Sequence, residues 1–457
     1  MTAPTPAVRE RALSLRAEEL PAYIYDLGAL RAHMAEVRAA LPERVELYYA
    51  AKANPEPEIL AALRPYVDGY EVSSGGELAH VGKAVPDAPL AFGGPGKTPK
   101  EITQALEIGV RRFHVESVYE LHMLAGLAAD LAPERRIAVL ARFNLPVDDG
   151  SLDGSSLAMG GRPTPFGLDP EQADEVVALL TDGTYPNLEL VGVHAHLASG
   201  LEAPEQLAVS EAIVTWAAQL AWRHRVGLSE VTIGGGMAVD YAAPERRFDW
   251  PAYGAGLARL AAAHPALTLR IEPGRALTAY CGWYATEVLD VKHSHGEEFA
   301  VVRGGTHHLR TPATKGHDQP CTVLRSDEPW PHPWPRSAAR GDRVTVTGQL
   351  CTPKDVLSRD VPAPGLRSGD RVVFGVAGAY AWNISHHDFL MHPHPEFHFL
   401  DSAGGVEGSA GGVDGAGEVA LGAVEGVVSG TAEDVVVGRA ERVHGRGERL
   451  LGMVEDG

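Results

Sequence analysis

The chain has 457 residues and a formal net charge of −20, from 60 acidic and 40 basic residues. So acidic a protein lacks the basic face that displaces counterions from nucleic acid, and nucleic-acid binding is not expected. The three cysteines, Cys281, Cys321 and Cys351, are far apart and odd in number, which argues against a disulfide framework and for a reducing compartment. The N-terminus is too charged for a signal peptide, and no apolar run is long enough to span a membrane. We expect a cytoplasmic protein with a small-molecule or protein partner.

Apolar runs of strand length alternate with stretches of helical period over the first 280 residues. Eight strand-like runs can be counted, at 45–50, 67–72, 90–94, 111–115, 137–144, 189–197, 230–234 and 267–272. Helical candidates between them lie at 56–64, 76–84, 99–109, 117–130, 171–182 and 204–225. Eight such units suit a (β/α)8 barrel better than an open, doubly wound sheet, although the count alone leaves both possible.

The composition changes beyond the predicted barrel. Strand-like alternation with few helical signals appears at 287–291, 299–302, 343–347 and 371–376, which predicts a separate C-terminal β-sandwich or barrel domain. We therefore divide the chain into four parts. They are an N-terminal segment packing on the β domain (1–25), the barrel (26–278), the β domain (279–400) and a tail without any Phe, Trp or Tyr that is predicted to be disordered (401–457).

Several chemically suggestive residues follow the predicted strands, where a barrel of this kind places its working side chains. Lys52 follows the first strand in VELYYAAKANP, and its alternative is a solvated charge at a strand end. His194 and His196 alternate on one predicted strand, so both should point the same way. Each could also be a satisfied buried histidine, and a zinc pair lacks a third ligand at a convincing spacing.

Two turns near the end of the predicted barrel suit an anionic ligand. The IGGG run at 233–236 could close backbone N–H groups around an anion, although a plain glycine turn is commoner. In IEPGR, Glu272 could hold a proton on a ring nitrogen and Arg275 could neutralise a phosphate or carboxylate. A structural ion pair is the alternative for these two residues.

The β domain carries two further motifs. Cys351 lies in GQLCTPKDVL, and a lone cysteine is ordinarily a small hydrophobe. The 378–400 segment holds Tyr380 and a group of five histidines, but their spacing matches no standard zinc pattern and two prolines interrupt it, so we predict no metal site. These histidines are His386, His387, His392, His394 and His398.

In this order, the motifs YYAAKAN, EVSSGGEL, GVHAHLASG, IGGG, EPGR, GQLCTPKDVL and GAYAWN resemble the fold-type III, pyridoxal-phosphate-dependent decarboxylases. This is the diaminopimelate and ornithine decarboxylase superfamily, with its alanine-racemase-like barrel. The resemblance covers about residues 20–400. The segments at 159–169 and 383–396 look further like the branch associated with siderophore biosynthesis, which acts on citryl-diaminopropionate and similar amino acids.

The resemblance implies a role for each matching residue. Lys52 would hold pyridoxal 5′-phosphate covalently until the substrate amine displaces it, His196 would stack on the ring, and Glu272 would keep the ring nitrogen protonated. Cys351 would reach across a homodimer interface and return a proton to the α-carbon. The positions matching those that hold the phosphate are Ser199, Gly235, Gly236, Arg275 and Tyr380.

One departure from the pattern bears on the substrate. The ornithine and diaminopimelate enzymes have an acidic residue after the cysteine, where this chain has Thr352. An uncharged side chain cannot balance a distal ammonium, which favours a substrate with a neutral or anionic distal part. We expect Arg162 and either His386 or His387 to contact its carboxylates.

Three other functions stay open on the sequence. The nearest is decarboxylation of diaminopimelate, ornithine or lysine, opposed by Thr352 and the two branch-like segments. A racemase or epimerase would need acid–base groups on both faces of the substrate, and only Cys351 accompanies Lys52. A non-catalytic pyridoxal-phosphate-binding protein would need no such cysteine.

Overall fold

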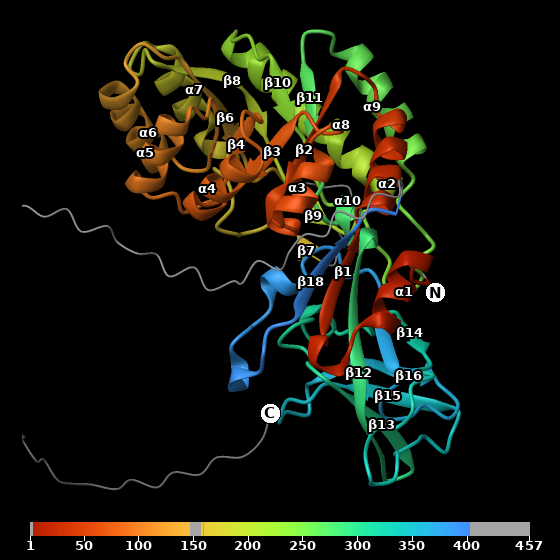
Figure 1. Cartoon of the computed structure of the whole chain (residues 1–457). Helices are drawn as coiled ribbons and strands as arrows, with labels where there is room; N and C mark the ends of the chain where they lie inside the picture. Colours follow the sequence, from red (N-terminus) through yellow and green to blue (C-terminus); the bar gives the residue numbers. More distant parts are fainter. Residues whose placement is uncertain (1–2, 147–156, 159, 403–457) are drawn as a thin grey trace, which may run out of the picture. The chain divides into compact units, whose positions relative to one another are not determined.

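The computed structural model describes residues 3–146, 157–158 and 160–402. The predicted disordered tail lies outside the described residues apart from its first two positions. A closed parallel barrel and a separate mixed sheet make up the described chain (Figure 1), which confirms the predicted fold class.

The barrel closes in the order β10-β11-β2-β3-β4-β5-β6-β8, and each of its eight strands corresponds to a predicted one. Adjacent strands are parallel throughout, and the ring closes where β11 pairs with β2 through Leu269 and Val45. The strands are β2 (Val45–Ala50), β3 (Gly69–Val72), β4 (Leu90–Phe92), β5 (Arg112–Val115), β6 (Ile137–Arg142), β8 (Leu188–His194), β10 (Glu230–Thr232) and β11 (Thr268–Ile271).

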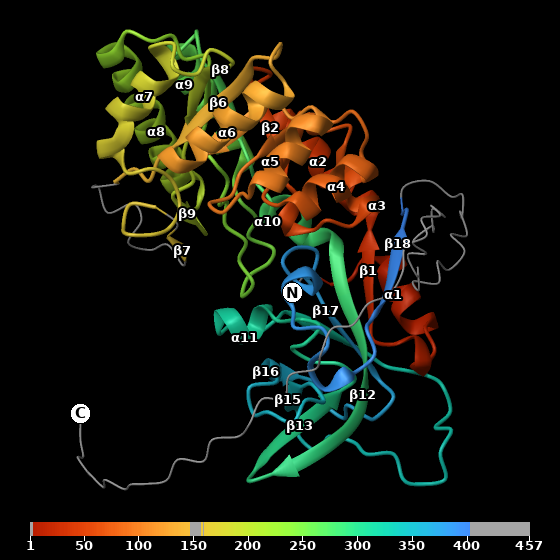
Figure 2. The same cartoon turned by 90° about the vertical axis from the view of Figure 1, so that its left-hand side faces the viewer.

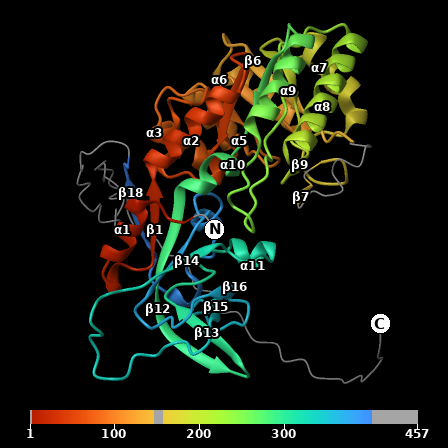
Figure 3. The same ribbon diagram turned by 90° about the vertical axis from the view of Figure 1, so that its right-hand side faces the viewer.

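Helices surround the barrel strands, as Figures 2 and 3 show from two sides. Six of them correspond to predicted helices: α3 (Pro57–Leu63), α4 (Gly75–Ala84), α5 (Pro99–Ile108), α6 (Val118–Leu131), α7 (Ala173–Thr181) and α8 (Ala203–His224). The prediction missed α2 (Leu27–Ala40) and α9 (Trp250–Ala263).

Side-chain caps start several helices immediately after a strand. Ser74 accepts a hydrogen bond from Glu77 N at the start of α4, and Ser117 does the same for Glu120 N at the start of α6. Asp26 caps α2 in the same way. Because a cap stops the chain from extending the strand, the segments between strand and helix stay short. The carboxyl ends of the strands therefore form one compact rim, where the site residues lie.

The second sheet is mixed and combines segments far apart in sequence. Its path runs β14-β17-β12-β13-β15-β16, and β1 pairs with both β12 and β18. Four strands overlap the predicted ones, but the predicted 287–291 run is only the middle of a longer strand, β12 (Figure 3). The strands are β1 (Ala22–Asp26), β12 (Gly282–Ser294), β13 (Glu297–Val302), β14 (Cys321–Leu324), β15 (Arg343–Thr347), β16 (Val356–Pro362), β17 (Arg371–Phe374) and β18 (Glu396–Leu400).

The N-terminal segment contributes α1 (Pro6–Ser14) as well as β1. Tyr23 and Tyr25 of β1 stack on Phe397 and Phe399 of β18. Val8 of α1 shares a buried apolar cluster with Trp283 and Val373. Among the described residues no helix has the length and apolar character that crossing a bilayer requires.

Candidate active site

Lys52 lies just beyond β2, in the short 3-10 helix η2 (Ala51–Ala53). Its Nζ donates to Glu71 Oε2 at 2.9 Å, and Glu71 also accepts from Ser73 Oγ. Desolvation acts to raise the pKa of Glu71, but the Lys52 charge outweighs it and holds that pKa well below its usual range. Desolvation likewise acts to lower the pKa of Lys52, and Glu71 reverses this shift, so the pKa of Lys52 is raised. The Lys52 side chain is 44% exposed, so a ligand can reach it.

His196 lies beyond the end of β8, so the prediction that it shares a strand with His194 is wrong. The strand ends at His194, and the two histidines have different partners. His196 Nδ1 accepts a hydrogen bond from Gly235 N at 3.0 Å, which assigns the ring hydrogen to Nε2. Desolvation, followed by the Lys52 charge, lowers the pKa of His196 to about 3. A neutral, planar imidazole therefore lies beside the lysine and is suited to stacking on an aromatic ring.

The IGGG run packs against two neighbouring segments with almost no space between the backbones. An ideal Cβ at Gly235 would lie 2.3 Å from Glu272 O. One at Gly236, where φ is +101°, would lie 2.1 Å from Ala198 O and 3.2 Å from the Cα of Ser199. Only glycine permits this approach. Ser199 belongs to the short strand β9 (Ala198–Ser199), which pairs with β7 (Leu157–Ala158).

Arg275 opens the short helix α10 (Arg275–Thr278). Its Nη1 donates to the Tyr241 hydroxyl at 2.6 Å, and its guanidinium lies 4.6 Å from the Tyr380 ring centroid. Tyr380 comes from the β domain, and its backbone N donates to Ala53 O, next to Lys52. The structure thus brings a guanidinium and two phenol hydroxyls to one place, a donor set that suits a phosphate.

Glu272 follows β11 and is 7% exposed. Its Oε2 lies 2.9 Å from His194 Nε2, and its Oε1 lies 3.7 Å from Nε2 of His114, a residue of β5. Burial raises the pKa of Glu272. Oε1 has no hydrogen-bond partner among the described residues, so it can accept a ligand N–H. His114, His194 and Glu272 also form the one group in the described chain whose ligand atoms are close enough to hold a metal ion.

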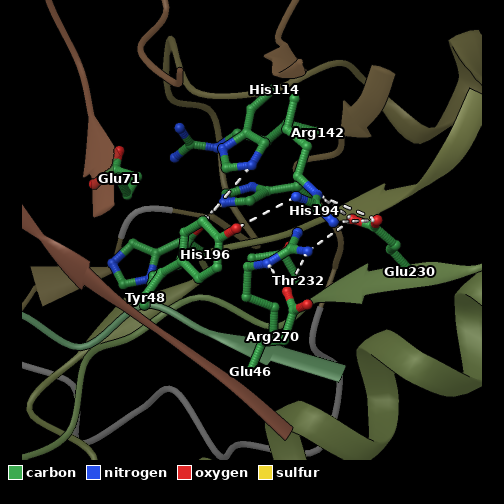
Figure 4. A network of polar contacts seen from close by, with 12 residues as sticks. Glu46, Tyr48, Glu71, His114, Arg142, His194, His196, Glu230, Thr232 and Arg270 are labelled. Atoms are coloured by element: carbon green, nitrogen blue, oxygen red, sulfur yellow. Dashed lines mark hydrogen bonds and ion pairs between the residues drawn. The ribbon is translucent and has the colours of Figure 1, made fainter. Parts of the chain in front are cut away.

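A buried ion network lies beneath these residues in the barrel interior (Figure 4). The Arg270 side chain is 0% exposed and donates to Glu46 Oε2 at 2.6 Å and to Glu230 Oε2 at 2.8 Å. Arg112 donates to the same Glu230 carboxylate. Paired and hydrogen-bonded in this way, the charges fill the barrel and support the strands that carry His114, His194 and Glu272.

Cys351 lies in an exposed turn of the β domain between β15 and β16. The turn is held by Asp355, whose carboxylate accepts from Thr306 N at 2.7 Å and from Leu350 N at 2.8 Å. The described contacts of Lys52 do not include Cys351. The predicted role of this cysteine therefore stays a prediction.

The four residues predicted to bind the substrate lie in three segments. Arg162 is exposed, in a loop held by Asn144, whose amide donates to Arg162 O. Thr352 is in the Cys351 turn. His387 stacks on Trp382 with ring centroids 3.6 Å apart. His386 is exposed, and its pKa is lowered by partial burial and then by the charge of Arg310. These contacts do not test the predicted roles.

The sequence reasoning assigned no role to several residues that the structure places at the site. Asn383 Nδ2 donates to Lys52 O at 2.6 Å, and Tyr241 accepts from Arg275. His194 was considered only as a satisfied buried histidine or as half of a zinc pair, and Glu71 only as part of the EVSSGGEL motif. Asn383, in GAYAWN, had a signal in its motif, whereas Tyr241 and His114 had none.

Comparison with known proteins adds a family and several relatives. Residues 27–279 match the family model described as "Pyridoxal-dependent decarboxylase, pyridoxal binding domain". A Staphylococcus aureus protein named 2-[(L-alanin-3-ylcarbamoyl)methyl]-2-hydroxybutanedioate decarboxylase is 38% identical over 391 residues, covering 84% of this chain and 96% of its own. The L-glutamyl-[BtrI acyl-carrier protein] decarboxylase of Niallia circulans is 31% identical, covering 82% of this chain and 88% of its own.

Solved structures show the same fold. A variant of diaminopimelate decarboxylase from Helicobacter pylori, crystallised with L-lysine, superposes with a TM-score of 0.74 at 25% sequence identity. The match covers 86% of this chain and 93% of that one. Both the barrel and the mixed sheet are therefore shared.

Proposed function

This chain belongs to the pyridoxal-dependent decarboxylases, and we propose that its substrate is an L-α-amino acid whose side chain ends in carboxylates. It is a decarboxylase that uses pyridoxal phosphate. This activity is favoured over the racemase and the non-catalytic binding protein that the sequence left open. The observation that carries the substrate proposal is the charge of the Cys351 turn. The name of the S. aureus relative supports it, because that protein's substrate joins an alanine unit through an amide to a hydroxy-dicarboxylate.

The site has the groups that pyridoxal phosphate requires. Lys52 supplies the amine, the neutral His196 ring a stacking surface, and Glu272 Oε1 an unused acceptor for the ring N–H. Arg275, Tyr241, Tyr380 and Ser199 would hold the phosphate. When bound, the cofactor supplies the electron sink for the electron pair left on the α-carbon as carbon dioxide departs.

The chain's own residues would bind, orient and move protons around that step. The Lys52 amine must lose a proton before it can bond to a carbonyl carbon, and Glu71 Oε2, at 2.9 Å, orients that amine. Glu272, as a carboxylate, would hold a proton on the ring nitrogen. Cys351 Sγ would return one proton to the α-carbon, leaving a primary amine in place of the amino acid.

A homodimer would bring Cys351 to this site. In one chain the cysteine occupies an exposed turn of the β domain, where a second copy could approach it. We propose that this turn completes the partner's active site, as the family resemblance implies. The three cysteines are free, in keeping with a cytoplasmic location for the enzyme.

The residues of the Cys351 turn that a ligand could reach are neutral or positively charged, which suits an anionic substrate. Thr352, directly after the cysteine, is neutral, and Lys354 is exposed. The one acidic residue of the turn, Asp355, is buried and accepts two backbone N–H groups, so it is not available to a ligand. A distal ammonium would meet no carboxylate here, whereas a distal carboxylate would meet an ammonium. We propose further contacts from Arg162 and from His386 or His387.

Mass spectrometry of the products in heavy water tests the proposal. The holoenzyme would be given citryl-diaminopropionate, diaminopimelate, ornithine and lysine in turn. We expect loss of carbon dioxide with uptake of one deuteron, and we expect kcat/KM to be highest for the citryl compound. Preference for diaminopimelate would refute the substrate class. Deuterium uptake without loss of carbon dioxide would refute the role of Cys351.

A charge reversal in the turn gives a sharper test. Thr352→Glu should lower kcat/KM for the citryl compound and raise it for diaminopimelate, whereas Thr352→Ser should leave the ratio unchanged. Arg162→Ala should raise KM for the citryl compound with little change in kcat. Full activity of Arg162→Ala at low substrate concentration would refute the proposed contact between Arg162 and the substrate.

A further inference from the structure

The histidine pair beneath Glu272 is not accounted for by the roles assigned so far. The side chains of His114 and His194 are 1% and 3% exposed, and their rings lie 4.1 Å apart at an interplanar angle of 31°. They come from two different strands, β5 and β8, which lie on either side of β6, so their meeting depends on the pairing of both strands with β6. Figure 4 shows the two rings side by side, next to Arg142. Only one of their four ring nitrogens contacts Glu272 within hydrogen-bond distance, His194 Nε2.

Two proton arrangements are compatible with the 2.9 Å contact. Either His194 Nε2–H donates to a Glu272 carboxylate, or a protonated Glu272 donates to a bare Nε2. The second leaves Glu272 neutral, and a neutral acid cannot balance a protonated ring nitrogen. The first leaves Glu272 charged, with its second oxygen, Oε1, still unpartnered. A hydrogen bond donated to the charged form stabilises that form against burial.

We infer that His194 is a positioning residue: it binds Glu272 Oε2, keeps the carboxylate ionised and so reserves Oε1 for the protonated ring nitrogen of the cofactor. The inference rests on the role proposed above for Glu272. His114 lies against the His194 ring and fills the space beneath it. Its Nε2, 3.7 Å from Oε1, is too far for a hydrogen bond. His114 therefore does not compete for the oxygen.

A neutral His114 suits this arrangement. Burial, followed by the neighbouring His194, lowers the pKa of His114 well below its usual range. Burial, followed by the Arg142 charge, lowers the pKa of His194 in the same direction. The charged groups that face the pair from the neighbouring elements are Glu71, Glu272, Arg142, Arg270 and Lys52. With both histidines neutral, Glu272 is the only charge in the three-residue group, and it can be matched by one ring N–H.

The metal alternative makes a different prediction. His114, His194 and Glu272 have ligand atoms within 4.8 Å of one another. A metal ion on these three would occupy Glu272 Oε1, which then could not accept the ring N–H. The two occupants are therefore mutually exclusive, and measurements on the holoenzyme can separate them.

The test is the ¹⁵N chemical shift of ring-labelled pyridoxal phosphate in the reconstituted holoenzyme. His194→Leu removes the donor and His194→Gln retains one. His398→Leu, in strand β18, is the control for losing a partly buried histidine elsewhere. We expect His194→Leu to move the resonance towards that of an unprotonated ring and to lower kcat roughly 10–100-fold, the range seen when the hydrogen-bond partner of a metal ligand is removed. His194→Gln should keep the resonance near the wild-type position.

Glu272→Gln separates this inference from the role on which it rests. If Glu272→Gln moves the resonance and folded His194→Leu does not, the role of His194 is refuted and that of Glu272 stands. If neither moves it, the proposed role of Glu272 fails as well. Should His194→Leu fail to fold, a His194→Gln resonance at the unprotonated position would refute the inference. One equivalent of bound metal in the holoenzyme, lost in His194→Leu, would also overturn it.

Discussion

Gly236→Ala should be among the most damaging single-methyl changes in this protein. Gly236 has a φ of +101°, in a region that costs a side-chain-bearing residue about 1–2 kcal/mol. The new Cβ would lie 2.1 Å from Ala198 O, whereas real contacts stay at or above 3.0 Å, so two backbone segments must separate by about 0.9 Å (3.0 − 2.1). Overpacking of this kind adds about 1–3 kcal/mol. The two terms together predict a loss of about 2–5 kcal/mol in the free energy of unfolding.

Urea unfolding and pyridoxal phosphate titration measure the two consequences of this change. The displaced backbone carries Ser199, so cofactor affinity should fall together with stability. Gly109→Ala is the matched control, because Gly109 has a φ of +96° with nothing within 4 Å of its Cβ position. It should show only the conformational term, about 1–2 kcal/mol. If Gly236→Ala loses no more stability than Gly109→Ala and binds the cofactor normally, the packing argument is wrong.

Three further predictions concern stability. Arg270→Met should cost about 1–3 kcal/mol in urea unfolding, because Glu46 loses its guanidinium partner while Glu230 keeps Arg112; an unchanged urea midpoint would contradict this. His196 has its pKa lowered to about 3 in the folded chain, from 6.5. It therefore stabilises the fold above pH 6.5, and that contribution is lost as the pH falls, by up to about 1.4 kcal/mol per unit. His196→Gln should make the urea midpoint depend less steeply on pH between pH 7.5 and 5.5. An unchanged slope of midpoint against pH would count against the lowered pKa of His196. Asp355→Ala should cost about 1–3 kcal/mol by leaving the N–H groups of Thr306 and Leu350 without acceptors, whereas Asp360→Ala, at an exposed ion pair, should change the midpoint little.

The barrel could be predicted from the sequence because its signals are local. Every strand of the barrel is a short apolar run, and six helices show an apolar face of their own. Short segments between strand and helix then place Lys52, Glu71 and Glu272 at one rim without knowledge of any long-range contact. The ends of the strands were harder to predict. The prediction that His194 and His196 lie on one strand was wrong, because the strand ends at His194.

The β domain shows where local signals end. β1 pairs with β12 and β18, strands more than 250 residues further along the chain, and no periodicity in the N-terminal segment indicates these partners. Similarly, the Asp355 carboxylate holds the Cys351 turn through Thr306, a residue with no motif of its own.

The sequence by itself predicted the barrel and the type of cofactor, because periodicity and ordered motifs need only neighbouring residues; the role of Lys52 stays a prediction. Only the tertiary structure decided which side chains act together. Glu71 meets Lys52, and His194 meets Glu272, across gaps of 19 and 78 residues. Those contacts arise where β2 pairs with β3 and where β8 and β11 both pair with β10. Their hydrogen bonds and buried charges depend on distances in space that the order of residues does not contain.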